Sequence, residues 1–183
     1  MAGWKDKRKI MQRYDLTAEM YEDRYAEEQT AKYEAAVEKV DVTDGFVLDV
    51  GCGSGLFFSH VAAKTKIVVG VDVSRKLLLK AKEQTRAFQN ALVLQADADH
   101  LPFRNAFFDA VFAFTVLQNM PKPDETLNEL KLVAKLGGKV VVTGLKKAFS
   151  LTAFMDVLES SGFRIASFVD NEDLKCYVAV LAF

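Results

Sequence analysis

The 183-residue sequence is poor in residues that form disulfides or bind metals. It contains two cysteines, Cys52 and Cys176, and two histidines, His60 and His100. Two cysteines cannot build a disulfide framework, and two histidines leave a metal site short of ligands. This scarcity predicts a reduced, cytoplasmic protein with no metal centre.

Long apolar runs and an excess of one charge are also missing. No stretch approaches the roughly 18 continuous apolar residues of a membrane helix, and no apolar run follows the basic first residues, so we expect neither a membrane partner nor a signal peptide. The formal net charge of −1 provides no overall field toward nucleic acid or an anionic membrane. The chain does have 50% hydrophobic and 27% charged residues, which is typical of one soluble globular domain.

The N-terminal part, residues 1–44, differs in texture from the rest. Between Lys5 and Val40 there is no proline or glycine, which predicts one or two helices, with a break near Asp15 and Thr17 as the cap of the second. Cations surround Trp4 at the start of this segment. They indicate either a surface that contacts RNA phosphates or a solvated helix start. These cations are Lys5, Lys7, Arg8, Lys9 and Arg13.

Residues 45–183 alternate between β-branched runs and amphipathic stretches. Parallel strands need a crossover, so this alternation predicts a parallel α/β sheet with its ligand site at the carboxyl ends of the strands. The expected helices are Gly55–Lys64, Ser74–Asn90, with Ser74 as its cap, and Asp124–Ala134. The expected strands are Phe46–Val50, Ile67–Val71, Ala91–Gln95, Phe108–Phe114 and Lys139–Thr143.

The end of the chain follows another pattern. After an expected helix, Phe149–Ser160, two expected strands, Phe163–Val169 and Tyr177–Phe183, are separated by only residues 170–176. That connection is too short for a helical crossover, so this pair must be antiparallel. A parallel sheet that ends in an antiparallel hairpin is more distinctive than a generic doubly wound fold.

A glycine-rich turn follows the first expected strand, in the sequence Val47-Leu48-Asp49-Val50-Gly51-Cys52-Gly53-Ser54-Gly55. Gly51 and Gly53 let the backbone bend and approach a ligand where a Cβ would collide. Asp49 faces a ligand ammonium group through the loop or a water. A dinucleotide fingerprint would need a third glycine where Leu56 stands, so an aminoacyl ligand fits better than a pyrophosphate.

Acidic residues end the next two expected strands. Asp72, at the end of the second, is suited to accept charge-assisted hydrogen bonds from both hydroxyls of a ribose. Asp97, at the end of the third, is suited to accept the exocyclic amine of an adenine, while the N–H of Ala98 donates to the ring. Asp99 competes with Asp97 for this role.

Together these segments resemble the class I S-adenosylmethionine-dependent methyltransferases, and most of all the small group that includes quinone- and tRNA-wobble-modifying enzymes. The resemblance runs from Phe46 to Thr143 and departs from the family at Leu136, where proline is usual. It implies a Rossmann-like three-layer α/β sandwich with sheet order 3-2-1-4-5-7-6, strand 7 antiparallel, and S-adenosylmethionine as cofactor. The residues it assigns to the cofactor are Asp49, Gly51, Cys52, Gly53, Asp72, Val73, Asp97, Ala98 and Thr115.

The resemblance also implies a lid and an acceptor pocket. In related enzymes a tyrosine of the N-terminal segment reaches the cofactor carboxylate, which here implies Tyr14 or Tyr25, and such a lid excludes water. Phe114, beside Thr115, is expected to line the methyl-transfer pocket. Gln118 and Asn119 either hydrogen-bond the substrate or cap the next turn.

The acceptor itself is left open by the sequence. The Asn-Pro-Pro-Tyr-like motif of amino-nitrogen methyltransferases is absent, and neither cysteine is placed as a nucleophile for cytosine-C5 chemistry. The remaining route is in-line displacement to a small molecule, a tRNA or a protein, with His100 as the nearest candidate base. The rivals are a nicotinamide-dependent oxidoreductase and a non-catalytic cofactor-binding subunit. A chain of this length leaves little room for a substrate domain, so a small activator subunit is one expected partner.

Overall fold

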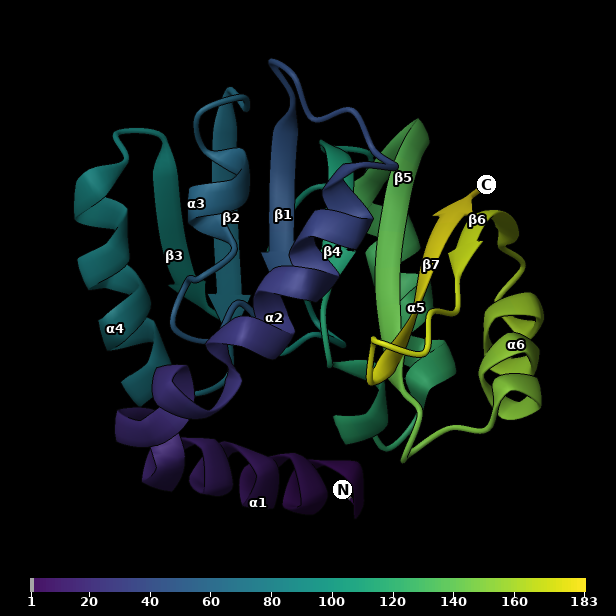
Figure 1. The fold of residues 1–183 in the computed structure, drawn as a ribbon, viewed down its shortest axis with the longest axis horizontal. Coiled ribbons are helices and arrows are strands. Elements are labelled where there is room, and N and C mark those ends of the chain that lie inside the picture. The colour runs from purple at the N-terminus through teal and green to yellow at the C-terminus, as the bar shows by residue number, and fades with distance from the viewer. Residues whose placement is uncertain (1) are drawn as a thin grey trace.

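The computed structural model describes residues 2–183, except for the side chains of residues 2–3 and 21–26. Its centre is one seven-stranded sheet of order β3-β2-β1-β4-β5-β7-β6 (Figure 1). β1 to β5 pair in parallel, and β7 pairs antiparallel with both β5 and β6. The predicted order and the terminal hairpin are therefore confirmed. The strands are β1 Phe46–Val50, β2 Ile67–Asp72, β3 Ala91–Gln95, β4 Phe108–Ala113, β5 Ala134–Leu145, β6 Arg164–Val169 and β7 Cys176–Ala182.

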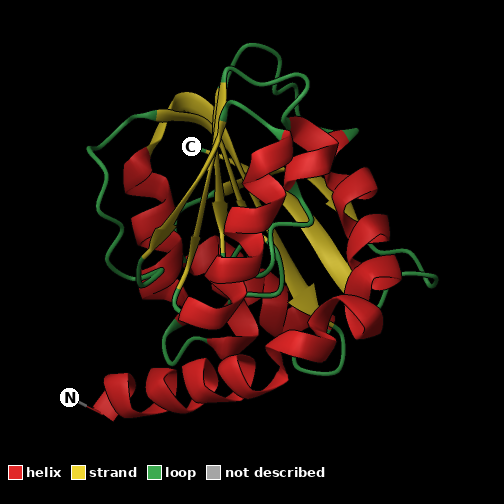
Figure 2. Cartoon of the chain, turned by 90° about the vertical axis from the view of Figure 1, so that its left-hand side faces the viewer, coloured by secondary structure: helices red, strands yellow, loops and turns green. Residues whose placement is uncertain are grey.

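Helices lie on both faces of the sheet and across one end of it (Figure 2). Side chains of β1 alternate between two cores: Val47 packs with Phe58 on the face of α2, α3 and α4, and Leu48 packs with Leu127 on the face of α5 and α6. This is the expected three-layer sandwich. The helices are α1 Ala2–Thr17, α2 Tyr21–Val37, α3 Phe58–Val61, α4 Arg75–Gln84, α5 Pro123–Val133 and α6 Leu151–Ser160.

α1 crosses the edge of the sheet at which the parallel strands end (Figure 1). Its C-terminal part is fixed to the cap of α4, because Asp15 accepts hydrogen bonds from Ser74 Oγ at 2.5 Å and from the N–H of Lys76 at 3.2 Å. Arg13 donates to Asn119 Oδ1 at 3.0 Å. The N-terminal segment thus covers the carboxyl ends of the strands, where the ligand site is expected.

Two local predictions are wrong. The helix expected over Gly55–Lys64 is reduced to α3, since Gly55 has a φ of +84°, which no α-helix accommodates, and the turn continues to Phe57. Thr17 does not cap the second helix: its hydroxyl donates to the carbonyl of Arg13 in the last turn of α1. By contrast, Ser74 caps α4 as predicted, accepting from the N–H of Leu77 at 3.2 Å.

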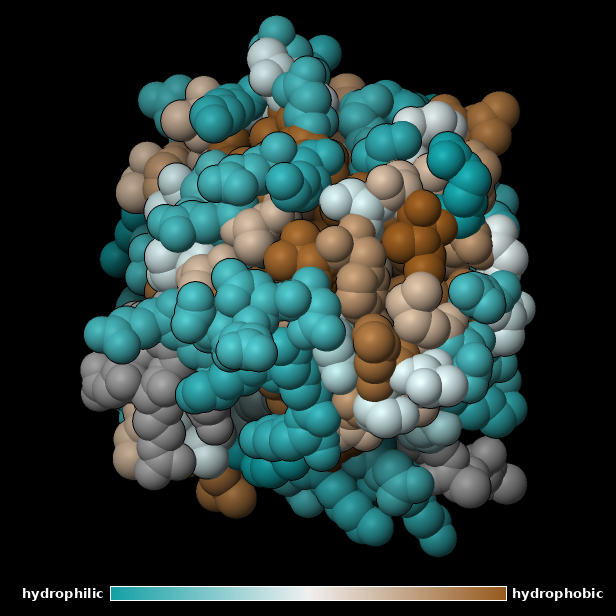
Figure 3. All heavy atoms as spheres, turned by 45° about the vertical axis from the view of Figure 1, so that its right-hand side comes forward, coloured by the Kyte–Doolittle hydropathy of each residue, from teal (hydrophilic) through white to brown (hydrophobic). Residues whose placement is uncertain are grey.

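The surface carries both hydrophobic and hydrophilic residues. Figure 3 shows hydrophobic residues gathered in the middle of one face and hydrophilic residues around them. On the α2 side of the sheet, α2 packs against β7, whereas no helix lies over β6 at the sheet edge in Figure 1. Half-buried Leu145 and Val169 pack against the core there. Within the part of the chain that the structure describes, every helix is too short or too polar to cross a membrane.

Candidate functional site

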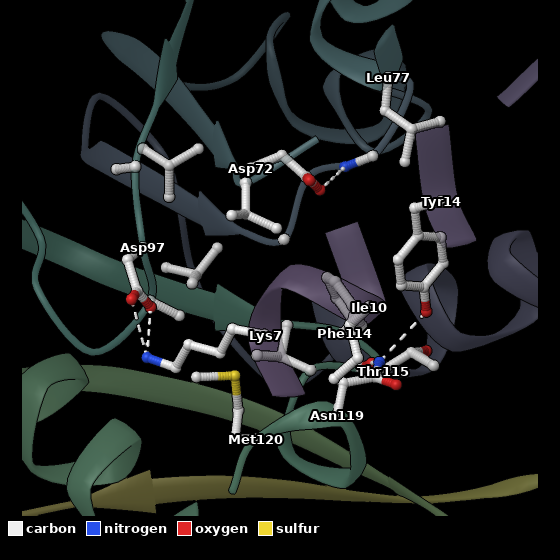
Figure 4. Close-up of a pocket in the computed structure, with 18 residues that line it drawn as sticks. Lys7, Ile10, Tyr14, Asp72, Leu77, Asp97, Phe114, Thr115, Asn119 and Met120 are labelled. Atoms are coloured by element: carbon white, nitrogen blue, oxygen red, sulfur yellow. Dashed lines mark hydrogen bonds and ion pairs between the residues drawn. The ribbon is translucent and has the colours of Figure 1, made fainter. Parts of the chain in front are cut away.

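A pocket lies under α1 at the carboxyl ends of β1 to β4 (Figure 4). Its volume is about 80 Å³. Lys7 and Ile10 of α1 form its outer wall, and Met120 closes it near the end of β4. Most of the predicted site residues line this single pocket. They are Tyr14, Gly51, Gly53, Asp72, Val73, Asp97, Ala98, Phe114, Thr115 and Asn119.

The glycine-rich turn after β1 is bound tightly to the end of β2. Gly51, Gly53 and Gly55 all have positive φ angles, which glycine adopts at little cost. The N–H groups of Gly51 and Cys52 both donate to the carbonyl of Val71, at 2.7 and 3.0 Å. A Cβ on Gly51 would lie 2.6 Å from Val116 Cγ2, so this position requires glycine for space as well as conformation. The turn is therefore a bare backbone wall of the pocket.

Asp72 is the acid at the end of β2. Its two oxygens accept from the N–H groups of Gly53 at 2.9 Å and Ser74 at 2.7 Å. Burial raises the pKa of Asp72 above its ordinary value, although these backbone hydrogen bonds oppose the rise. Each carboxylate oxygen has a second lone pair, so Asp72 can still accept two hydrogen bonds from a ligand.

Asp49 and Cys52 lie behind the pocket wall and do not line it. Asp49 is 2% exposed, and burial, with the nearby charge of Asp72, raises its pKa well above the ordinary value. The side chain of Cys52 turns into the core beside Gly70, and burial also raises the pKa of its thiol. Contact of Cys52 with a ligand would have to use its backbone, whose N–H already donates to Val71.

The burial of Asp49 predicts how the stability of the protein depends on pH. Its raised folded pKa means that its contribution to stability is fully present below the ordinary pKa, about 4, and is lost as the pH rises through the folded pKa. Asp49→Asn removes this loss. We expect the melting temperature of the variant to rise relative to the unliganded wild type between about pH 4 and 7, by about 3 °C per kcal/mol. Thermal melts of both proteins at about pH 4 and about pH 7 measure this difference in melting temperature. Parallel curves for the two proteins would contradict it.

Lys7 pairs with Asp97, the acid that the sequence assigns to the adenine amine. Its Nζ lies 2.7 and 2.8 Å from the two oxygens of Asp97 (Figure 4). Lys7 also forms an ion pair with Asp99. Burial lowers the pKa of Lys7, but its hydrogen bonds to both acids prevail and raise it overall. Asp99 also accepts from Thr126 Oγ1 at 2.5 Å. Lys7 is therefore neither an RNA contact nor part of a solvated helix start.

Because Lys7 competes for Asp97, removing it frees this carboxylate. We expect Lys7→Met to bind S-adenosylhomocysteine about tenfold more tightly than the wild type, which corresponds to about 1.4 kcal/mol. Calorimetric titration measures the difference. Lys9→Met is the matched control, because Lys9 is exposed and pairs only with Asp6 among the contacts described. Weaker binding by Lys7→Met would show that Lys7 supports the ligand instead of competing with it.

Polar groups converge on the backbone just after β4. The carbonyl of Thr115 accepts from Gln118 Nε2 at 2.6 Å and from Asn119 Nδ2 at 2.9 Å, and Asn119 Nδ2 also donates to the hydroxyl of Tyr14 at 3.1 Å (Figure 4). Gln118 thus caps this turn and does not line the pocket. Asn119 does both, and it joins the turn to α1. Phe114 forms the neighbouring apolar wall.

Two candidates, His100 and Tyr25, lie outside this arrangement, and the second histidine of the chain, His60, is structural. The side chain of His100 is exposed and does not line the pocket, although its backbone N–H donates to the backbone carbonyl of Asp97 at 2.9 Å. The side chain of Tyr25 lies outside the residues described. His60 packs edge-on against Tyr33, and burial lowers its pKa. Among the residues with described side chains, no three His, Cys, Asp or Glu gather where a metal ion would bind.

The fold and the pocket together define a nucleotide-binding α/β domain, with a glycine turn after β1, an acid at the end of β2 and a site where the strand order reverses. A family model described as a methyltransferase domain matches residues 48–142. The chain belongs to the class I S-adenosylmethionine-dependent methyltransferase family. This membership sets aside the nicotinamide-dependent alternative.

Individual relatives agree with the family. The chain is 34% identical over 149 residues to a ubiquinone/menaquinone biosynthesis C-methyltransferase, UbiE, of Burkholderia vietnamiensis, over 74% of this chain and 60% of that protein. A methyltransferase structure from Aquifex aeolicus matches with a TM-score of 0.80 at 20% identity, covering 91% of this chain and 97% of the other. A Haloferax volcanii methyltransferase in complex with the activator Trm112 matches with a TM-score of 0.77 at 17% identity, covering 92% and 96%. The chain spans about half the length of the curated relatives it matches.

The residues of the pocket fit the family cofactor, S-adenosylmethionine. Asp72 keeps lone pairs for the ribose hydroxyls, and Gly51 and Gly53 line the pocket with backbone alone. Asp97 is suited to the adenine amine once Lys7 releases it. Thr115, at the other end, would lie near the methionine moiety and the transferred methyl group.

Proposed function

We propose that this protein transfers a methyl group from S-adenosylmethionine to a small-molecule acceptor by in-line displacement, and that residues 1–44 act as its lid. The observation that carries the proposal is the single pocket that joins Asp72 at the end of β2 to Thr115 after β4, under α1. A cofactor held at Asp72 would present its far end to Thr115. The acceptor would then approach from the side of α1.

The acceptor end of the pocket favours a small, partly apolar molecule. Ile10, Phe114, Val116 and Met120 form its walls. Tyr14, fixed by Asn119, is the nearest polar group from α1. A tRNA or protein acceptor would have to insert one base or side chain beneath α1, which a small molecule entering under the helix does not need.

The chain contributes chiefly position and exclusion of water. When bound, S-adenosylmethionine supplies a methyl group activated by its positively charged sulfur. Asp72 and the Gly51 turn would fix the cofactor, and α1 would keep water from the acceptor. Orientation of this kind accounts for roughly 7–11 kcal/mol in favourable intramolecular reactions. No histidine lines the pocket among the residues described, so the acceptor is expected to react without a histidine base.

The proposal is tested with labelled S-adenosylmethionine and a cell lysate separated into RNA, protein and metabolites. Label in the metabolite fraction supports the small-molecule acceptor. Label in RNA or protein alone would overturn it in favour of a translation component. Binding of S-adenosylhomocysteine with no label in any fraction would support a non-catalytic cofactor-binding subunit.

We propose further that the cofactor end of the pocket needs no residue from a second chain, because Gly51, Asp72 and Asp97 all line it. The Haloferax methyltransferase was solved with Trm112, which makes an activator the alternative to test. Purified protein is compared with protein supplemented with a protein-only lysate fraction. Transfer that requires the supplement would show that a small activator subunit is needed.

A further inference from the structure

A buried lysine lies directly behind the acceptor end of the pocket. Lys32 of α2 is 1% exposed, and its Nζ donates to Glu28 Oε1 at 2.7 Å and to Thr115 Oγ1 at 3.3 Å. Lys175 donates to the other oxygen of Glu28 at 3.0 Å. Two lysines therefore share one carboxylate, which leaves the group with a formal charge of +1. Burying a cation is costly unless it is paired, and Glu28 provides that pair for Lys32 beside Thr115.

Thr115 is itself held in a costly conformation. Its φ is +61°, which is unusual for any residue with a side chain and a marked outlier for a β-branched one. Its N–H donates to Thr143 Oγ1 at 2.8 Å, and two side chains bind its carbonyl. Strained residues fixed at every polar backbone atom are typical of functional sites.

The hydrogen bond from Lys32 limits where the Thr115 hydroxyl can donate. A lysine ammonium can only donate, so Thr115 Oγ1 accepts from Lys32 and must point its own hydrogen elsewhere. Thr115 lines the pocket, and no described group accepts this hydrogen. The pocket that Thr115 lines is therefore one place where this hydrogen can be donated. A hydroxyl that accepts from a cation is also polarised, which makes it a stronger donor.

The charges around the pocket are unequally distributed. The carboxylates that line it, Asp72 and Asp97, belong to the ends of β2 and β3. After β4 the described lining residues carry no carboxylate, so nothing there would hold a cationic amine. Lys32 places a positive charge behind Thr115 instead.

We propose that Lys32 is a positioning residue that polarises the Thr115 hydroxyl, and that the pair recognises an acceptor with an anionic oxygen, such as a phenolate or enolate. The inference rests on the proposed function, because the acceptor is the second ligand of the same pocket. Such an oxygen would accept the Thr115 hydrogen bond and bring the nucleophilic oxygen, or the carbon conjugated with it, toward the cofactor.

The experiment uses protein saturated with S-adenosylhomocysteine and three ring probes: 4-nitrophenolate, nitrobenzene and 4-nitrobenzylammonium. At a pH where the phenol is ionised, we expect the wild type to bind 4-nitrophenolate about tenfold or more tightly than nitrobenzene, the usual value of one charge-assisted hydrogen bond. Lys32→Met and Thr115→Val should each bring the two probes to within about threefold. Lys32→Arg and Thr115→Ser, which keep the charge and the hydroxyl, should retain part of the preference.

The outcomes separate this inference from the proposed function. If S-adenosylhomocysteine does not bind, the proposed function fails. If it binds but the wild type takes nitrobenzene or the ammonium probe as tightly as the phenolate, the inference alone is overturned. A preference that survives in both Lys32→Met and Thr115→Val would also overturn it. Should Lys32→Met fail to fold by circular dichroism, Thr115→Val decides the question.

Discussion

Replacing Asp72 by asparagine is expected to weaken binding of S-adenosylhomocysteine by at least about 100-fold. Both oxygens of Asp72 already accept a backbone N–H, from Gly53 and from Ser74. An amide would direct its NH₂ group toward one of these donors and leave one ribose hydroxyl without an acceptor. Charge-assisted hydrogen bonds are worth about 1.5–3 kcal/mol each and neutral ones about 0.5–1.5 kcal/mol. The loss of one bond and of the charge assistance in the other, about 2.5–4.5 kcal/mol together, corresponds to roughly 10²–10³ in affinity.

Asp109→Asn is the matched control for this change. Asp109 also accepts a backbone N–H, from Phe46 at 2.9 Å, and pairs with Lys135 at 2.7 Å, but it lies at the start of β4 and does not line the pocket. We expect this variant to lose stability and to keep its affinity for the ligand. Calorimetric titration of both variants, each shown to be folded, provides the comparison. An affinity for Asp72→Asn within threefold of the wild type would refute the assignment of the ribose.

The sheet could be predicted from the sequence because its signals are local. β1 and β3 begin and end at the predicted residues, and the short connection before β7 required the antiparallel hairpin that is observed. The error in the helix after Gly55 arose because two local signals, a helical pattern and a glycine turn, overlap there. The helical pattern after Gly55 was read to Lys64, but the left-handed glycines extend the turn and leave α3 only Phe58–Val61.

The site was predictable only in part, for a related reason. Strand ends followed by glycine or aspartate are visible in the sequence, and Gly51, Asp72 and Asp97 do meet in one pocket. The pocket contacts of Lys7 and Lys32 were missed because a lysine on a helix is typically solvated, and Asp97 and Thr115 lie 90 and 83 residues away from them. No periodicity reports such pairs. For Lys7, the one local signal was the pair of acids Asp97 and Asp99 after β3, both of which it contacts.

A second large effect is expected at the glycine turn. Gly51→Ala should lower the free energy of unfolding by about 3 kcal/mol, of which about 1–2 kcal/mol comes from placing a Cβ at a φ of +73°. The rest comes from the collision of that Cβ with Val116 Cγ2 at 2.6 Å, since overpacking typically costs about 1–3 kcal/mol. Urea unfolding of the unliganded protein measures the total.

Two further variants separate the strain from the collision. Gly137→Ala places a Cβ at a φ of +81°, where it meets nothing within 4 Å, so it should cost only about 1–2 kcal/mol. In a double-mutant cycle, Val116→Ala removes the methyl group that Gly51→Ala meets. The loss of stability in the double variant should therefore be smaller than the sum of the two single losses, by about the collision energy. Equal losses for Gly51→Ala and Gly137→Ala, together with additivity in the cycle, would show that the turn needs glycine for its conformation alone.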